Sequence, residues 1–292
     1  MSSSSSDPEK AIDEKPIDEK AVDEKASQST SLENAIHIQR IVREGIILGG
    51  GATAILLQVA MPGVGKGVDN HSNFAYRPMD RLRTTMTYVY CMAFGSPKEK
   101  EAVIAMVHRA HSSVKGTDYS ADDAQLQVWV AATLYAVGVE LYEEIFGPMD
   151  EVTAEQTYRE YAVLAVSLRV QPDQWPPTRQ AFWAYWDQQI ASIEVNDHSK
   201  HVAHDLLYNT GLPIHLRVLM PWVRLMTGEM LPARIREAYG IKTNKHRQRG
   251  YRWTMSLVRN TYPAMPKFIR TYPKKYYLND MRKRLRKAQM LN

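Results

Sequence analysis

The chain has 292 residues, 44% of them hydrophobic and 24% charged, and this composition provides a core while excluding a wholly disordered or fibrous protein. Its 37 Lys and Arg against 32 Asp and Glu give a net charge of +5, too small for a dedicated nucleic-acid binder and of the wrong sign for an acidic buffer. The charge is unevenly distributed. Residues 7–25 carry eight acids and four lysines, whereas residues 243–292 carry fourteen Lys and Arg against one Asp.

Residues 1–30 form a Ser-rich leader in which a five-residue unit ending in Asp-Glu-Lys is repeated. One apolar residue per unit matches neither the helical nor the strand period, so a disordered leader is predicted. The N-terminus shows no secretory signal. The single cysteine, Cys91, excludes an internal disulfide, a Cys-based zinc site, an iron–sulfur cluster and covalent c-type haem attachment. We therefore expect an intracellular, reducing location, cytoplasmic or peripheral to the cytoplasmic face of a membrane such as the ER.

From about residue 31 the sequence has the periodicity of helices. The longest apolar run, Ile46–Pro62, is shorter than the roughly 18 to 20 residues that span a bilayer. It is interrupted by Gly49, Gly50, Gly51, Thr53 and Gln58. A buried helix is the preferred interpretation, and a membrane-touching segment is the alternative. The three glycines lack the spacing of a phosphate loop and are expected to serve close helix packing.

Two amphipathic segments, Glu99–Val114 and Asp122–Phe146, are the clearest helices because their apolar residues recur at spacings of three and four. Alternating strand patterns are scarce, and no linker is long enough to require a second domain. The prediction is an all-α fold, with one multi-helix domain over residues 31–273 and a basic C-terminal tail over residues 274–292. Further helices are predicted at Ala154–Arg169, Thr178–Ile193, Lys200–Tyr208, Pro213–Thr227, Pro232–Tyr239 and Gln248–Asn260.

Histidines are the most informative candidates for chemistry. His111 falls on the apolar face of its predicted helix, where an imidazole is either a satisfied core residue or a metal ligand shielded from water, while His108 lies toward the edge. His198, His201 and His204 are spaced i, i+3 and i+6, so the first and last diverge by about 120° around a helix. Surface histidines are therefore preferred there over a metal site.

A third candidate is the segment Asp80–Thr85. Arg81 and Thr85 lie one helical turn apart and share a face, so they can offer a cation and a hydroxyl to the same ligand. The alternative is an ordinary helix start with a solvated arginine and a capping aspartate.

Several short stretches of the sequence form a recognisable series when they are taken in chain order. They are Gly49-Gly50 with Leu57–Val64, His71–Phe74 with Pro78, Arg81–Thr85, His111–Gly116, Tyr119–Asp123, Trp129–Leu134, Phe182–Trp186, and Leu231-Pro232 with Arg236–Gly240. This series resembles the family shared by bacterial latex-clearing protein and the fungal MpaB-type oxygenases. The resemblance covers about residues 40–270, and the order and spacing of the stretches make it more specific than any one of them.

The resemblance implies a globin-like helical core around non-covalently bound haem b, with His111 as the proximal ligand of the haem iron. It places Arg81 and Thr85 in the distal pocket, where they contact the cofactor and take part in catalysis. Two positions depart from the family. Thr84 stands where latex-clearing protein has a distal lysine, and Ala131 stands where many relatives have a histidine. Thr84 is retained as a candidate catalytic residue, and the catalytic base is not identified by motif.

The family resemblance implies a haem-dependent oxygenase that uses O₂ to oxidise or cleave a small, apolar, unsaturated substrate such as a terpenoid, polyketide or lipid side chain. The alternative is a helical haem-binding or membrane-associated protein without oxygenase chemistry, acting as a carrier, sensor or cyclase. The basic, aromatic-containing C-terminal region suits either nucleic acid or an anionic membrane surface. Peripheral membrane contact is preferred, and no nucleic-acid partner is expected. The oligomeric state is not predicted.

Overall fold

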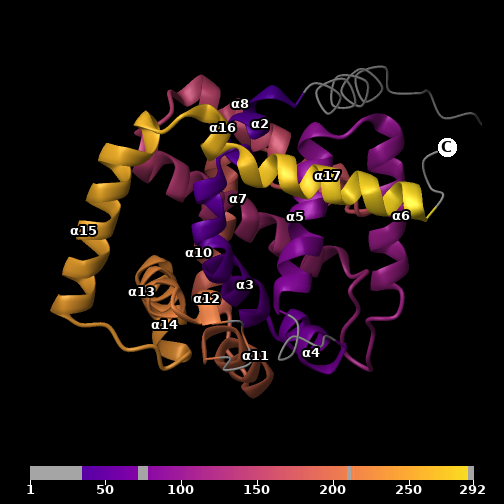
Figure 1. Ribbon diagram of the computed structural model, residues 1–292. Helices are drawn as coiled ribbons and strands as arrows, with labels where there is room; N and C mark the ends of the chain where they lie inside the picture. Colours follow the sequence, from indigo (N-terminus) through magenta and orange to yellow (C-terminus); the bar gives the residue numbers. More distant parts are fainter. Residues whose placement is uncertain (1–34, 72–77, 209–211, 213, 289–292) are drawn as a thin grey trace, which may run out of the picture. The chain divides into compact units, whose positions relative to one another are not determined.

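The structure, a computed structural model, describes residues 35–71, 78–208, 212 and 214–288 (Figure 1). Within these residues the fold is all-α, as predicted, and the extended pairing is limited to one isolated bridge between Lys115 and Ser120. The predicted leader, residues 1–30, lies outside the described residues, as do residues 72–77 of the motif that begins at His71. The globin-like arrangement of the core stays a prediction.

The helices follow one another with short connections. In chain order they are α2 (Ile36–Val42), η1 (Gly45–Gly50), α3 (Gly51–Ala60), α4 (Pro62–His71), α5 (Pro78–Phe94), α6 (Pro97–His111), α7 (Ala124–Phe146), α8 (Glu151–Tyr161), α9 (Val163–Val166), η2 (Pro172–Gln174), α10 (Arg179–Ser192), α11 (Asp197–Tyr208), α12 (Ile214–Arg217), α13 (Met220–Met230), α14 (Ala233–Ala238), α15 (Lys245–Thr261), η3 (Tyr262–Ala264), α16 (Lys267–Arg270) and α17 (Tyr272–Lys287).

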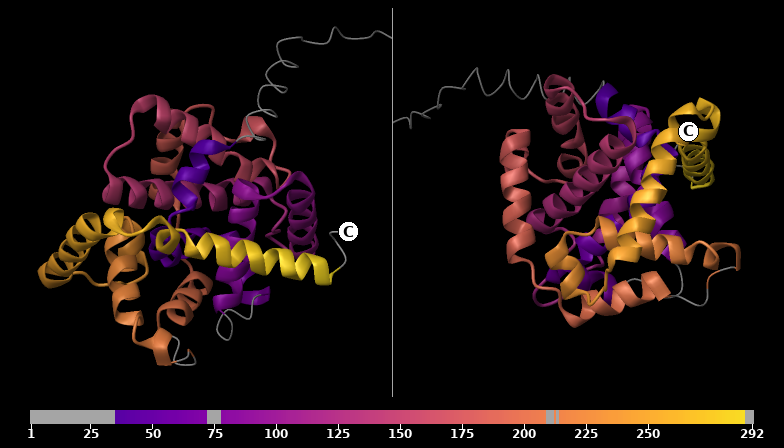
Figure 2. Two further views of the ribbon diagram at one scale, coloured as in Figure 1. Left: turned by 45° about the horizontal axis from the view of Figure 1, so that its top comes forward. Right: turned by 90° about the vertical axis from the view of Figure 1, so that its left-hand side faces the viewer.

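Helix α7 lies among the other helices and organises the core (Figures 1 and 2). It packs against α3, α8, α9 and α15, and most of its side chains are buried. Trp129 stacks on Trp186 of α10 at 5.3 Å between ring centroids, and Tyr135 meets Phe182 edge to face at 4.7 Å. Such aromatic pairs add to the stability gained from burying their area. The predicted helix Asp122–Phe146 is thus confirmed, with its N-cap at Asp123.

Among the described residues, α7 is also the one unbroken helix long and apolar enough to cross a membrane. Its most apolar stretch has a mean hydropathy of 1.2, and 67% of that stretch is buried inside the fold. The pair formed by α2 and the segment Gly45–Ala60 passes the same test only if it is taken as one span, and it is bent by 69°. Burial of this kind is what a core helix shows.

Gly50, one of the three glycines that interrupt the apolar run, acts in close helix packing, as predicted. The chain forms the 3-10 helix η1 up to Gly50 and then continues as α3. A Cβ on Gly50 would lie 2.6 Å from Cγ1 of Val137, so only a glycine lets η1 approach α7 this closely.

The predicted end of one helix is wrong. Helix α6 begins at Pro97 behind a capping box of Ser96 and Glu99, but it stops at His111 instead of reaching residue 114. The next two serines bond backward, since Ser112 donates to the Arg109 carbonyl and Ser113 donates to that of Ala110. These bonds compete with continued helix and turn the chain into the loop that leads to α7.

Two predicted helices are each divided in the structure. The segment predicted as one helix over Ala154–Arg169 forms α8 and α9. The segment predicted over Pro213–Thr227 forms α12 and α13, and Pro221 lies at the start of α13. Proline has no backbone N–H to continue a preceding helix and is tolerated in a first turn, which accounts for the second break.

Helix α17 was not predicted, and it runs across the expected start of the tail at residue 274 (Figure 1). It packs against α5 through a buried face that includes Met281 and Leu285, each 1% exposed. Asp280 accepts hydrogen bonds from Arg83, and Arg282 donates to Glu99 at 2.7 Å. Part of the basic charge of the C-terminal region is therefore paired within the fold.

Candidate functional site

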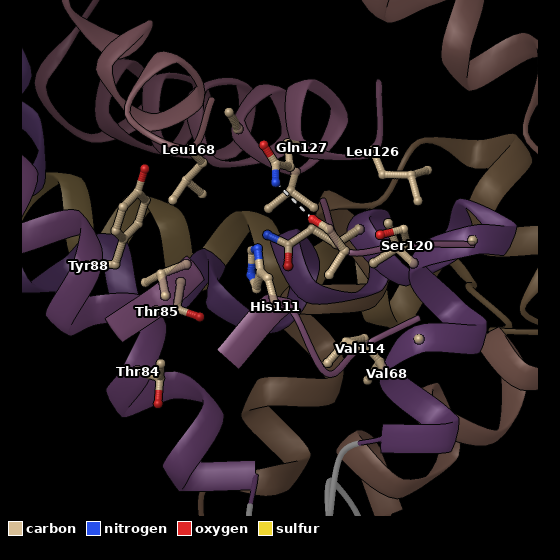
Figure 3. Close-up of a pocket in the computed structure, with 18 of the residues that line it drawn as sticks. Val68, Thr84, Thr85, Tyr88, His111, Val114, Ser120, Leu126, Gln127 and Leu168 are labelled. Atoms are coloured by element: carbon tan, nitrogen blue, oxygen red, sulfur yellow. Dashed lines mark hydrogen bonds between the residues drawn. The ribbon is translucent and has the colours of Figure 1, made fainter. Parts of the chain in front are cut away.

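A cavity of about 260 Å³ lies between α4, α5, α7 and the end of α6 (Figure 3). Its wall is mostly aliphatic, and Arg81, Thr84, Thr85 and His111 all line it, so the structure brings the predicted site residues together. The aliphatic lining consists of Val64, Val68, Val107, Val114, Leu126, Val130, Leu134, Leu164 and Leu168.

His111 is the last residue of α6 and projects into this cavity (Figure 3). Its Nδ1 atom is buried and has no hydrogen-bond partner in the described part of the chain. Burial lowers the pKa of His111, against the opposing effect of the Asp122 carboxylate. The imidazole is therefore neutral at pH 7, which is the form that binds a metal ion. His108, one turn earlier, does not line the cavity.

Arg81 brings a half-buried positive charge to the same cavity. Its Nε atom is buried without a partner, and within the described residues its guanidinium forms neither an ion pair nor a hydrogen bond. Burial lowers the pKa of Arg81 to about 10, so the side chain remains charged at neutral pH. Even partial burial of a cation without a counter-charge is costly, and an anionic or strongly polar ligand would offset that cost.

The two threonines of α5 differ in what their hydroxyls do. Thr84 donates a hydrogen bond of 2.9 Å to the carbonyl of Asp80, one turn back in its own helix, and is turned away from His111 (Figure 3). Thr85 forms no hydrogen bond with the described residues, which leaves its hydroxyl available to a ligand. Ala131 also lines the cavity, so both departures from the family lie on its wall.

Three polar lining residues were not proposed as site residues from the sequence: Gln58, Tyr88 and Gln127. Tyr88 donates to the carbonyl of Leu164 at 2.7 Å, and Gln127 donates through Nε2 to that of Ala121 at 2.8 Å. Gln58 is 3% exposed. A signal was present in its case, because it is a single amide within the otherwise apolar end of α3.

His71 and Tyr119 meet at the edge of the cavity. The Nε2 atom of His71 lies 3.0 Å from the Tyr119 hydroxyl, and the amide of Asn70 also donates to that hydroxyl. Both His71 and Tyr119 line the cavity, and His71 is exposed to solvent. Together they hold the end of α4 against the loop that follows α6.

The histidines of α11 lie outside the cavity lining and face α4. The Nδ1 atoms of His198 and His201 each lie 2.6 Å from a carboxylate oxygen of Asp69. Burial alone would raise the pKa of Asp69, but the hydrogen bonds with the two histidines outweigh it and the pKa is lowered. The bond to Asp69 raises the pKa of His201.

Within the described residues, no group of three or more His, Cys, Asp or Glu side chains is arranged to hold a metal ion. The cavity instead offers one imidazole, one cation and an aliphatic wall. That donor set suits a group that is bound through a single imidazole nitrogen within an apolar pocket.

Comparison with known proteins adds a family match over most of the chain. The family described as "ER-bound oxygenase mpaB/B'/Rubber oxygenase, catalytic domain" matches residues 38–260. The relatives include the uncharacterized proteins Mb2261 of Mycobacterium bovis and Rv2237 of Mycobacterium tuberculosis. Each is 29% identical over 250 residues, which covers 82% of this chain and 98% of the relative. No solved structure matches significantly.

Because of the contacts of Asp69 with His198 and His201, we expect the free energy of unfolding of the protein to depend on pH. Because the pKa of His201 is raised in the folded protein, protonation of His201 stabilises the fold at pH values below its unfolded pKa of about 6.5. This stabilisation is lost as the pH rises through the folded pKa. Because the pKa of Asp69 is lowered in the folded protein, its ionised carboxylate stabilises the fold above about pH 4. This stabilisation is lost as the pH falls through the folded pKa of Asp69. Asp69→Asn should therefore destabilise the protein more at about pH 5.5 than at about pH 8.5. Because His201 is well exposed, we expect a difference of about 1 kcal/mol or less in urea unfolding. A difference that does not vary with pH would contradict this.

Arg81 and Arg83 lie on the same helix, but we expect substitution by leucine to change the free energy of unfolding in opposite directions at the two positions. Arg81→Leu removes an unpaired, half-buried charge, so it should raise the free energy of unfolding of the ligand-free protein by about 1 kcal/mol. Arg83→Leu removes the partner of Asp280 and should lower it by roughly 0.5–1 kcal/mol. Urea unfolding of both variants is the measurement. Destabilisation by Arg81→Leu would show that Arg81 is satisfied in the ligand-free chain.

Proposed function

Because the chain belongs to the family of the ER-bound oxygenase mpaB/B' and rubber oxygenase catalytic domains, we propose that it is a haem b-dependent oxygenase that uses O₂. Its substrate is a small, apolar, unsaturated molecule, such as a terpenoid, a polyketide or a lipid side chain of secondary metabolism, which it oxidises or cleaves. The observation that carries this proposal is the neutral imidazole of His111 in an aliphatic cavity beside the unpaired Arg81.

The residues of the cavity fit such a group. His111 would hold the haem iron through an imidazole nitrogen, and its buried Nδ1 without a partner in the described residues supports that role. When bound, haem supplies the capacity to activate O₂. Arg81 and Thr85 offer a fixed cation and a free hydroxyl where negative charge develops. The aliphatic wall excludes water and binds the apolar substrate.

Thr84 has a smaller part in this proposal. Its hydroxyl is committed to the carbonyl of Asp80, so it contributes to catalysis only if that bond is exchanged for one to a ligand. A hydroxyl is a weaker metal ligand than the amine of the family's lysine, so Thr84 would not hold the group as that lysine would.

A second candidate is a haem-binding carrier or sensor without oxygenase chemistry. The observation that favours it is the absence of any Asp or Glu from the cavity lining within the described residues, which leaves no carboxylate to act as a base. O₂ consumption with a terpenoid alkene separates the two candidates, because only the oxygenase consumes O₂ in proportion to the alkene.

Substitution of the proposed iron ligand is the direct test. Purified protein reconstituted with haem should show a Soret band, and His111→Ala should abolish the band or weaken haem affinity by at least about tenfold. His108→Ala is the matched control, because His108 lies on the same helix but outside the cavity lining. It should bind haem as the unaltered chain does. Absence of a Soret band in the unaltered chain would sink the proposal.

We further propose peripheral contact with an anionic membrane through the basic C-terminal region. No Asp or Glu occurs between residues 243 and 279. Large apolar side chains are exposed there, including Trp253 on α15 (69%), Phe268 on α16 (67%) and Tyr272 on α17 (63%). Basic residues next to exposed aromatic and aliphatic side chains are typical of surfaces that dock on anionic lipid.

Point substitutions test this contact better than truncation, because removing residues 274–292 would expose the face of α5 on which α17 packs. The double variant Trp253→Ser and Phe268→Ser should lose most binding to vesicles containing phosphatidylserine. Val152→Ser, which changes a 67% exposed residue on α8, should bind normally. Binding to uncharged vesicles equal to that on anionic ones would contradict the proposal, as would vesicle binding that is unchanged in the double variant.

A further inference from the structure

Gln58 is a buried amide without a partner at the cavity. Its side chain lines the cavity, the residue is 3% exposed, and it forms no side-chain hydrogen bond with the described residues. A carboxamide carries two donors and one acceptor, and burying it unpaired costs on the order of 1–3 kcal/mol. The other lining amide, Gln127, is already bonded to the carbonyl of Ala121.

The backbone around Gln58 is held in place by side chains from three other parts of the fold. The carbonyl of Leu56 accepts a bond of 2.7 Å from the Tyr239 hydroxyl. The carbonyl of Leu57 accepts one of 2.9 Å from the Trp129 indole. The carbonyl of Val59 accepts one from the Ser199 hydroxyl. These donors satisfy backbone groups at the end of α3 and fix the position from which the Gln58 side chain extends.

We propose that Gln58 hydrogen-bonds an oxygen function on the molecule that occupies the cavity, so that the occupant is an oxygen-bearing apolar compound and not a hydrocarbon. A ligand carbonyl would accept from the Gln58 amide nitrogen, and a ligand hydroxyl would donate to its oxygen. A hydrocarbon would leave the buried amide unpaired, and the site would reject it for that reason. This inference rests on the proposed function for the identity of the occupant as the substrate.

The test uses the haem-loaded full chain and two probes of equal length, 2-decanone and decane, with binding followed by tryptophan fluorescence. The ketone should bind at least about tenfold more tightly than the alkane, and Gln58→Leu should reduce that ratio to about threefold or less by weakening the ketone. Gln127→Leu is the matched control. It alters the other amide of the lining, whose nitrogen is already held by the Ala121 carbonyl and so is not aimed at a ligand, and it should leave the ratio unchanged.

Several results would overturn the inference: no ketone binding, equal binding of the two probes, or a ratio unchanged in Gln58→Leu. A loss of haem affinity in Gln58→Leu with the ratio intact would assign the amide to the haem carboxylates instead, and would also overturn it. The proposed function fails separately. If the chain shows no Soret band after haem is added, the same two probes are measured on the haem-free chain, and discrimination that is lost in Gln58→Leu would retain the role of Gln58.

Discussion

Burial of α7 is the constraint on which both the core and the cavity depend. Its apolar side chains extend around most of the helix, so α3, α8, α9 and α15 must cover it. The same helix contributes Leu126, Val130 and Leu134 to the cavity wall. Trp129 links the two roles, because its ring stacks in the core while its indole nitrogen bonds the end of α3. The site is therefore built on an element that cannot move without disturbing the core.

In the described part of the chain, buried polar groups without a partner occur both at the cavity and away from it, where Tyr135, Trp175 and Thr227 are examples. Outside the cavity many other polar groups are paired across helices, as in Arg83 with Asp280, Arg282 with Glu99, and two histidines with Asp69. At the cavity, Nε of Arg81 and Nδ1 of His111 are buried without a partner, and the Gln58 side chain forms no hydrogen bond with the described residues. Unpaired buried groups lower stability, and these three lie where a bound molecule can pair with them.

The sequence predicted the helical class, the start of α6 and the extent of α7, because these depend on local periodicity and capping. It also placed Arg81, Thr85 and His111 as candidates, and the fold brings them to one cavity. It did not predict the end of α6, which two serine side chains decide, or α17, whose buried face is hidden among basic residues. Gln58 was missed because its isolation depends on which distant groups are already bonded.

The two departures from the family alter what the cavity can bind. With Thr84 in place of a lysine and Ala131 in place of a histidine, Arg81 is the one permanent cation on the described lining. Positive charge is then concentrated at a single point, and the remaining wall is aliphatic or neutral. Affinity for an apolar molecule comes from that wall. Discrimination comes from Gln58 and Arg81, since a ligand that pairs neither leaves two buried polar groups unsatisfied.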